Sequence, residues 1–240
     1  DESKMFGEFL SLLTADPDDV AAAGVRIEML ETLDLLHGGH TWKAALRFGD
    51  ALGRMPWRAL IQQKRMLELG SGTGVAGILA ARAAGPLSTV VLTDGNAAIA
   101  AALPANIAAN AMELQCSAAR YEWGCDISGL GTAPYDVILV ADCLYSRRAV
   151  TALCDALDQL VHPNVTRVLC GCEERWGTAD CLSVFAQREW DLVERGGEHF
   201  PLTLLYGESS TPPREGTFHH FELRRRNSCT VVASHLPGLA

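Results

Sequence analysis

Apolar residues along the chain occur in two patterns, short continuous runs and longer stretches with helical spacing. The runs Arg65–Leu69 and Thr89–Asp94 predict two β-strands. Between them, the alanine-rich stretch Val75–Ala84 predicts a helix that ends at Gly85. A third run, Tyr135–Ala141, is almost entirely apolar, which is typical of a strand covered on both faces. This succession predicts β-α-β units with parallel strands.

The rest of the chain continues this alternation. Further strands are predicted at Cys116–Trp123, Val165–Cys172, Asp191–Glu194 and Phe218–Arg224, with an edge strand at Val25–Leu30. Helices are predicted at Met5–Leu13, Thr41–Leu52, Asn96–Met112, Arg148–Val161 and Val184–Trp190, the third with an interruption at Pro104. A turn at Asp16–Asp19 is predicted to begin a further helix, and a loop is predicted at Leu204–Gly216. The order of these elements predicts an α/β fold with an open, doubly wound, mostly parallel sheet that ends in an antiparallel hairpin.

Composition narrows the class of protein. The 240 residues suffice for one large domain with a full core, and 48% hydrophobic and 20% charged residues are typical of a globular protein. The net charge is −9 and the one dense basic run is Arg224–Arg226, so we expect no nucleic-acid groove and a surface suited to a basic protein partner. No apolar run is long enough to cross a membrane and no secretory signal is visible, so we expect no membrane association.

The eight cysteines are scattered and form no C-x-x-C pair, so we expect neither a metal site nor a redox site. Cys170 and Cys172 are two residues apart in an apolar run, which places them on one face of a strand. Free thiols are typical of the cytosol and the nucleus, and we therefore expect a cytoplasmic protein, present also in the nucleus.

A glycine-rich turn, Glu68-Leu69-Gly70-Ser71-Gly72-Thr73-Gly74, follows the strand at 65–69. Its alternating glycines allow strained backbone angles and a close approach by a ligand, which predicts a nucleotide-binding turn. A dinucleotide fingerprint would need a third glycine at position 75, where the chain has valine, so NAD is the weaker interpretation. Asp94 ends the next strand and is predicted to accept hydrogen bonds from ribose hydroxyls, the alternative being a cap for the following helix.

Ala141-Asp142-Cys143-Leu144-Tyr145, taken with L-E-L-G-S-G-T-G and L-T-D, resembles methyltransferase family 16, a group rich in protein-lysine methyltransferases that use S-adenosylmethionine (SAM). Four further segments resemble segments of the family and occur in the same order along the chain: Gly39–Ala45, Tyr121–Gly124, Cys170–Arg175 and Phe218–Arg224. The third of these is similar to the corresponding segment of the family member that acts on valosin-containing protein. The resemblance implies a seven-stranded methyltransferase domain over 41–226, an N-terminal extension over 1–40 and a C-terminal tail over 227–240.

The resemblance also implies roles at the cofactor. Gly70, Ser71 and Gly72 would run beneath the methionine moiety and the sugar, and Glu68 would anchor the turn or the amino group of the ligand. Asp94 would hold the ribose. The other cofactor contacts implied are Trp42 at the methionine end, Trp123 stacked on the adenine and Ala141 through its backbone, with ordinary anchoring or core roles as the alternatives for both tryptophans.

At the reacting centre the resemblance implies that Asp142 orients the incoming ammonium and that Tyr145 shapes the channel. The alternative for Asp142 is a helix cap. Glu173 and Arg175 are predicted either to line the substrate mouth or to form a surface ion pair. Methyl transfer to an amine is an in-line displacement, so alignment supplies most of the acceleration and bulk water can take the proton.

We therefore expect a SAM-dependent protein-lysine methyltransferase that releases S-adenosylhomocysteine (SAH), works as a monomer and, by resemblance, acts on a chaperone or an ATPase. Methylation of a small molecule or of RNA is a second hypothesis, although Asp142-Cys143-Leu144-Tyr145 lacks the two prolines typical of enzymes that methylate the amino group of adenine. A SAM-fold binding module without catalysis is a third hypothesis.

Overall fold

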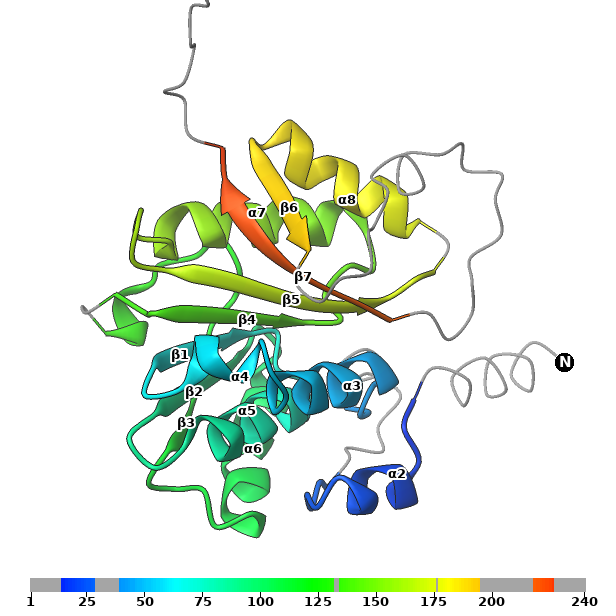
Figure 1. Cartoon of the computed structure of the whole chain (residues 1–240), viewed down its shortest axis with the longest axis vertical. Coiled ribbons are helices and arrows are strands. Elements are labelled where there is room, and N and C mark those ends of the chain that lie inside the picture. Colours follow the sequence, from blue (N-terminus) through cyan, green and yellow to red (C-terminus); the bar gives the residue numbers. More distant parts are fainter. Residues whose placement is uncertain (1–13, 29–38, 132–133, 176, 195–217, 227–240) are drawn as a thin grey trace, which may run out of the picture.

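A single seven-stranded sheet forms the centre of the fold (Figure 1). We describe it from a computed structural model, which covers residues 14–28, 39–131, 134–175, 177–194 and 218–226. The strands stand in the order β3-β2-β1-β4-β5-β7-β6. Their bounds are β1 Arg65–Leu69, β2 Thr89–Asp94, β3 Cys116–Arg120, β4 Val137–Ala141, β5 Arg167–Glu173, β6 Trp190–Glu194 and β7 Phe218–Arg225.

Strands β1 to β5 are parallel, and β7 lies antiparallel between β5 and β6. Leu67 of β1 pairs with Val91 of β2 on one side and with Ile138 of β4 on the other. This register aligns the carboxyl ends of the three strands at one edge of the sheet. The predicted α/β fold, doubly wound and mostly parallel with an antiparallel terminal pair, is confirmed.

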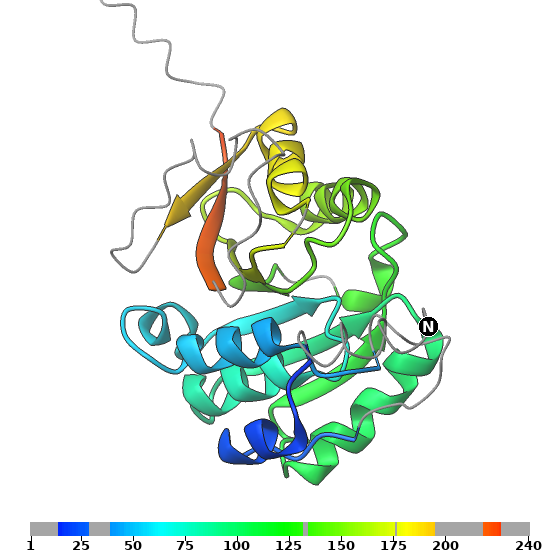
Figure 2. The same ribbon diagram turned by 90° about the vertical axis from the view of Figure 1, so that its right-hand side faces the viewer.

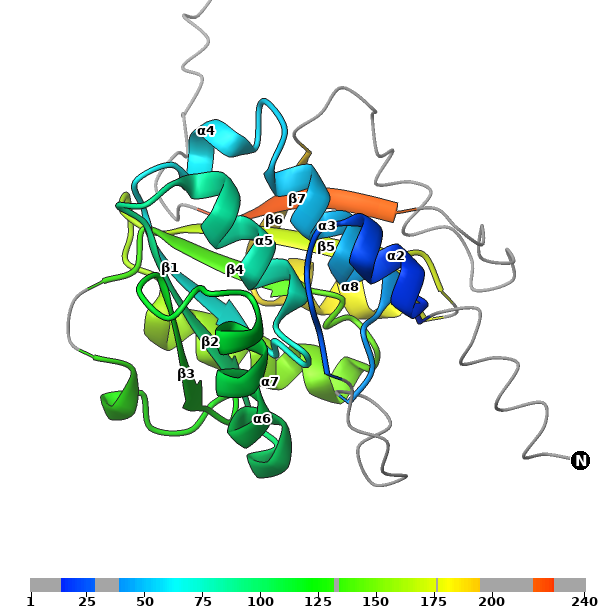
Figure 3. The same ribbon diagram turned by 90° about the horizontal axis from the view of Figure 1, so that it is seen from below.

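Helices cover both faces of the sheet. Their bounds are α2 Pro17–Ala22, α3 Lys43–Leu52, α4 Arg58–Ile61, α5 Val75–Ala84, α6 Ala97–Ala109, α7 Arg147–Leu160 and α8 Thr178–Gln187, with a 3₁₀ turn at Ser128–Leu130. Figures 1 and 3 show α7 and α8 on one face and α3, α5 and α6 on the other. In Figure 2, α2 lies on the same side as α6. None of the described helices is both long and apolar enough to cross a lipid bilayer.

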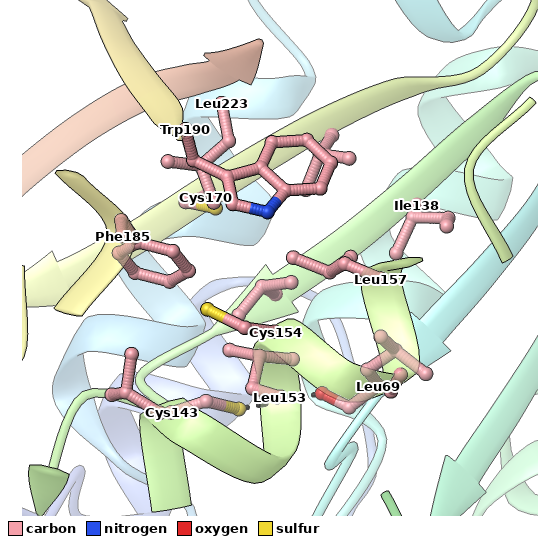
Figure 4. Packing of buried hydrophobic residues seen from close by; sticks show 14 of the residues in the cluster. Leu69, Ile138, Cys143, Leu153, Cys154, Leu157, Cys170, Phe185, Trp190 and Leu223 are labelled. Atoms are coloured by element: carbon pink, nitrogen blue, oxygen red, sulfur yellow. Dashed lines mark hydrogen bonds between the residues drawn. The ribbon is translucent and has the colours of Figure 1, made fainter. Parts of the chain in front are cut away.

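Alternate residues of each central strand face the two layers, as the period of a strand requires. Met66 belongs to the hydrophobic cluster of α3, α5 and α6, whereas its neighbour Leu67 belongs to the cluster of α7 and α8. Figure 4 shows the second cluster, in which Trp190 and Phe185 pack near Cys170. Cys172 belongs to the same cluster, so the prediction that Cys170 and Cys172 share one face of a strand is confirmed.

The predicted edge strand at Val25–Leu30 is wrong over its described residues 25–28, which belong to no strand. Asparagine side chains of α6 hold this segment instead. The backbone N–H of Glu28 donates to Asn106 Oδ1 at 2.8 Å, and the N–H of Arg26 donates to Asn110 Oδ1 at 3.0 Å. An asparagine amide offers a donor and an acceptor, so it can replace a neighbouring strand for an extended backbone.

Three other element predictions need correction. Helix α6 continues through Pro104 without interruption, because buried Leu103 and Ile107 fasten it to the core on either side. The last helix runs over Thr178–Gln187, so Trp190 begins β6 instead of ending a helix. Strand β3 stops at Arg120, three residues before the predicted end.

The turn at Asp16 is confirmed as a helix start, because the Asp16 side chain accepts a hydrogen bond from the N–H of Asp19 and so caps α2. Val20 and Val25 belong to the same hydrophobic cluster as α5. The predicted helix at Met5–Leu13 and the predicted loop at Leu204–Gly216 lie outside the described residues.

Candidate active site

The glycine turn connects β1 to α5 at the carboxyl edge of the sheet. Gly70, Gly72 and Gly74 have φ values of 68°, 52° and 82°, in the left-handed region that favours glycine. The N–H of Ser71 donates to the carbonyl of Thr93 at 2.8 Å, and the Ser71 hydroxyl accepts from the N–H of Thr93 at 3.0 Å. The turn is thereby fixed to the end of β2.

Trp123 packs directly against this turn. A Cβ atom placed on Gly70 would lie 2.7 Å from Trp123 Cζ2 and 3.0 Å from Cys143 Sγ, so only glycine fits there. Trp123 reaches the turn because β3 ends at Arg120 and the chain turns at Glu122, whose carbonyl accepts from the N–H of Cys125 at 3.0 Å. Trp123 lines the cavity and is partly buried against the hydrophobic cluster of α7 and α8.

Asp94 stands at the end of β2 and bridges the turn to the next loop. Its Oδ2 accepts from the N–H of Gly72 at 3.1 Å, and its Oδ1 accepts from the N–H of Asn96 at 2.9 Å. Burial raises the pKa of Asp94, while these two hydrogen bonds oppose the shift. The residue that caps α6 is Asn96, whose Oδ1 accepts from the N–H of Ala98 at 2.9 Å, so the helix-cap alternative for Asp94 is wrong.

Glu68 is fully buried beneath the turn and does not line the cavity above it. Its Oε2 accepts from the N–H of Gly77 at 3.2 Å, and its Oε1 has no hydrogen-bond partner among the described residues. Burial raises the pKa of Glu68 to about 8. Gly77 makes room for this carboxyl group, because a Cβ atom there would lie 2.5 Å from Glu68 Oε2.

A cavity of about 670 Å³ opens at this edge of the sheet. It brings together nine of the ten predicted site residues, all but Glu68: Trp42, Gly70, Ser71, Gly72, Asp94, Trp123, Ala141, Asp142 and Tyr145. Sequence reasoning did not single out several further lining residues, namely His40, Ala45, Thr73, Ile99, Glu122, Cys143, Ser146, Arg148 and Ala152. Some of these are adjacent in sequence to predicted positions. Helix residues such as Ile99 and Ala152 are marked by no motif.

Asp142 lies immediately after β4 in a backbone conformation that is rare outside glycine, with φ of 56°. Its N–H donates to the carbonyl of Gly171 at 2.7 Å, and its Oδ2 accepts from Arg175 Nη2 at 2.7 Å. Burial raises the pKa of Asp142, and the guanidinium of Arg175 opposes the shift. Ser146 is the residue that caps α7, so the helix-cap alternative for Asp142 is wrong.

Arg175 and Glu173 do not form a surface ion pair. Glu173 is buried, and Arg175 lines the cavity while contacting Asp142 and Glu173 together. The guanidinium carbon lies 5.3 Å from the centre of the Trp42 ring, within the range of a cation–π contact. Trp42 immediately precedes α3, and its neighbour Thr41 is tied to Thr73 of the glycine turn by a 3.0 Å hydroxyl contact.

The cavity has the parts that an adenosine-based cationic cofactor requires. Gly70 and Gly72 line it without side chains, and Asp94 is a carboxylate suited to ribose hydroxyls. Trp123 is a flat wall suited to a base. The same cavity is also lined by Asp142 and by the exposed residue Tyr145, which are candidates to meet a second reactant.

This fold and this site define a nucleoside-binding α/β protein of the doubly wound class. The chain belongs to the lysine methyltransferase family, whose sequence model matches residues 24–188. It is 29% identical over 216 residues to protein-lysine N-methyltransferase EFM3 of Chaetomium thermophilum, covering 83% of this chain and 62% of that protein. It is 33% identical over 119 residues to protein N-lysine methyltransferase METTL21A of Danio rerio, covering 48% of this chain and 52% of that protein.

The chain thus spans less than two thirds of the length of these curated relatives. Among solved structures, it is similar to a SAM dependent methyltransferase from Aquifex aeolicus, with a TM-score of 0.51 and 10% identity. That match covers 75% of this chain and 91% of the other. At this identity the likeness shows the shared fold alone.

Proposed function

We propose that this protein is a SAM-dependent protein-lysine N-methyltransferase. The observation that carries the proposal is the cavity at the carboxyl edge of β1, β2 and β4. The predicted cofactor residues other than Glu68 line this cavity together with Asp142, in a chain of the lysine methyltransferase family. One cavity thus holds candidate residues for both reactants of the transfer.

The glycine turn, Asp94 and Trp123 are the residues that would hold the cofactor. Gly70 and Gly72 would let the ligand approach the backbone, Asp94 would accept hydrogen bonds from the ribose and Trp123 would stack on the base. When bound, SAM supplies a methyl carbon on a sulfonium, and transfer forms the N–C bond as the C–S bond breaks, leaving SAH and a proton for the solvent. Glu68 supports the turn from beneath through Gly77.

Asp142 and Tyr145 shape the acceptor end. Asp142 lines the cavity and is held by its hydrogen bond with Arg175, and Tyr145 lines the cavity while 56% exposed. We assign Asp142 to orienting the incoming amine and Tyr145 to bordering its path. The chain's main contribution is to hold the two reactants in line, which alone accelerates a displacement strongly.

The net charge of −9 favours a lysine that lies in a basic segment of its protein. We further propose a chaperone or an ATPase as the substrate, and a monomer as the working form. The described cysteines are free thiols, six of the seven being buried, which supports a reducing compartment such as the cytoplasm or the nucleus.

Incubation with radiolabelled SAM and a cell extract, followed by mass spectrometry of labelled bands, tests the proposal. We expect a discrete protein carrying methyl-lysine, at least tenfold less labelled with Asp142→Ala, because roughly 1.4 kcal/mol of transition-state alignment corresponds to tenfold in rate. Leu114→Ser is the matched control, since Leu114 is 99% exposed and does not line the cavity. We expect its labelling to equal that of the wild type.

Other outcomes would contradict the proposal in distinct ways. Label found only in RNA or in small molecules would show that the methyl acceptor is not a lysine of a protein. Binding of SAH without label on any component of the extract would indicate a binding module. Binding of NAD without binding of SAH would indicate a dehydrogenase and remove the methyltransferase assignment altogether.

A further inference from the structure

The second half of the glycine turn is held by residues from outside the sheet. Thr73 lies between Gly72 and Gly74, is 7% exposed and lines the cavity. Its hydroxyl lies 3.0 Å from the hydroxyl of Thr41, and its carbonyl accepts a hydrogen bond from Asn106 Nδ2 at 3.0 Å. The first half of the turn is fixed to the end of β2 instead. Thr73 is therefore the point where two segments distant in sequence contact the turn.

Asn106 of α6 joins the glycine turn to residues 24–28, which we call the segment 24–28. The residue is 2% exposed. Its Oδ1 accepts from the N–H of Glu28 at 2.8 Å, and its Nδ2 donates to the carbonyl of Thr73 at 3.0 Å and to that of Glu28 at 3.4 Å. An asparagine amide has an acceptor oxygen and two donor hydrogens, so both kinds of group are used. One buried side chain thus contacts the segment and the turn together.

Asn110, one helical turn later, holds the same segment without reaching the glycine turn. Its Oδ1 accepts from the N–H of Arg26 at 3.0 Å, and its Nδ2 donates to the carbonyl of Arg26 at 2.6 Å. None of its hydrogen bonds within the described part of the chain is made to the glycine turn. Asn106 and Asn110 therefore differ in their contact with Thr73 while sharing the segment 24–28.

The glycine turn depends on such contacts because its own residues restrict it little. Gly70, Gly72 and Gly74 all have positive φ, and glycine adopts positive and negative φ about equally readily. A ligand that binds one arrangement of the turn binds more weakly in proportion to the fraction of molecules that adopt this arrangement. A residue that holds Thr73 can therefore raise the affinity for the ligand without touching it.

We propose that Asn106 is a positioning residue for the cofactor, which couples the segment 24–28 to Thr73 and thereby sets the affinity of the cavity for SAM and SAH. This inference rests on the proposed function, which supplies the ligand. Asn106 is not among the residues that line the cavity, so it acts through Thr73. Because coupling is reciprocal, a ligand that favours the held turn also favours the held segment.

Asn106→Asp and Asn110→Asp form a matched pair of variants. Each substitution keeps the shape of the side chain and its acceptor and removes the amide donor, but only Asn106 directs that donor to Thr73. Calorimetry gives the dissociation constant of SAH for each protein. We expect it to rise about tenfold in Asn106→Asp and to stay within about threefold of the wild type in Asn110→Asp, because only the first leaves the carbonyl of the turn without its donor.

A second pair, Asn106→Ala and Asn110→Ala, repeats the comparison without introducing a charge. We expect the same difference in SAH affinity between its two members. Urea unfolding of all four variants measures the stability that each has lost. A loss of affinity that is confined to position 106, at a similar loss of stability in both positions, separates positioning of the turn from general support of the fold.

Amide hydrogen exchange tests the coupling in the wild type itself. We expect saturating SAH to slow exchange of the Glu28 N–H at least about threefold. The N–H of Asp19 is the internal control, because it donates to the side chain of Asp16 and should be unaffected by SAH. In Asn106→Asp, which keeps the acceptor for the Glu28 N–H, we expect SAH to lose its effect on Glu28.

Equal weakening of SAH by the substitutions at positions 106 and 110 would overturn the proposal, because α6 would then support the cavity only as part of the fold. An unchanged affinity in both Asn106 variants would overturn it as well. So would exchange at Glu28 that SAH leaves unchanged in the wild type, or slows no more than at Asp19. Failure of the wild type to bind SAH at all would contradict the proposed function instead, so the two failures are distinguishable.

Discussion

Glu68 shows how a single acid can shape the site without lining it. Its carboxyl group is sealed beneath the glycine turn, with one oxygen bonded to Gly77 and the other without a partner among the described residues. A buried carboxylate in these surroundings is costly, so the protonated form is favoured and the pKa rises to about 8. At neutral pH the Glu68 carboxyl group beneath the glycine turn is therefore uncharged.

Stability should depend on pH through this group. The native state keeps the proton up to about pH 8, whereas the unfolded chain loses it near the ordinary value of 4.5. The free energy of unfolding therefore falls as pH rises from about 4.5 to about 8, by roughly 1 kcal/mol per pH unit, and levels off above that range. We expect Glu68→Gln, which mimics the neutral acid and cannot titrate, to lack this fall.

Urea unfolding of the wild type and of Glu68→Gln between pH 5 and pH 9 measures the effect, with the range set by the two pKa values. The difference between the two proteins isolates Glu68 from Asp94 and Asp142, whose pKa values burial also raises. Glu113→Gln, at an exposed glutamate, controls for loss of an acid. A difference between wild type and Glu68→Gln that stays constant with pH would contradict the buried, protonated state.

Among the site residues, those in the glycine turn and at strand ends could be predicted because the backbone fixes their positions. Gly70 and Asp142 directly follow strands, and Asp94 ends one, in runs that the apolar pattern predicts. The contact of Arg175 with Asp142 could not be predicted as a buried pair, since 33 residues separate the two and only the pairing of β4 with β5 brings them together. The burial of a side chain depends on neighbours that are distant in sequence, so a local sequence pattern cannot predict it.

At the scale of elements, α3 lies unusually close to β5. The contact is made where Gly171 exposes bare backbone to the ring of Phe48, and a Cβ atom there would lie 2.5 Å from Phe48 Cγ. Gly171 also accepts the hydrogen bond from the N–H of Asp142. The packing of α3 and the position of the acceptor carboxylate therefore depend on one glycine.

Gly171→Ala should destabilise the protein by about 1–3 kcal/mol, the usual range for overpacking a core. Phe48→Ala removes the ring atoms Cγ and Cδ2 that the new methyl group meets and leaves only Cβ in contact, so we expect the cost of Gly171→Ala to be smaller in that background. Urea unfolding of the four proteins of this double-mutant cycle measures the coupling. Additive effects of the two substitutions would show that the close approach of α3 does not restrict position 171 to glycine.

The element predictions failed where side chains or tertiary packing replaced a local rule. The strand predicted at Val25–Leu30 pairs with no other strand over its described residues, and Asn106 and Asn110 provide its hydrogen bonds. Pro104 disfavours a helix locally, yet the packing of its neighbours keeps α6 continuous. Strands β1 and β4 were predictable because their apolar runs are covered on both faces.

For the whole molecule, the two hydrophobic clusters share their strands. Met66 and Val137 contribute to the cluster of α3 and α5, while Leu67 and Ile138 contribute to the cluster of α7 and α8. Neither layer can lose its packing without exposing one face of β1 and β4. The described fold is therefore expected to unfold in one cooperative transition, and the cavity at its edge should disappear with it.

A ligand of the folded cavity should raise the melting temperature of this single transition. At free SAH about 100-fold above its dissociation constant, binding adds about 2.7 kcal/mol, or roughly 5–10 °C for a chain of this size. Asp94→Asn should reduce the shift at the same SAH concentration, because the amide replaces one acceptor oxygen with a donor where the ribose would bind. Calorimetry with and without SAH measures both shifts. Two separate transitions would contradict the shared-strand argument, whereas an equal shift in Asp94→Asn would contradict the ribose contact and leave the fold unaffected.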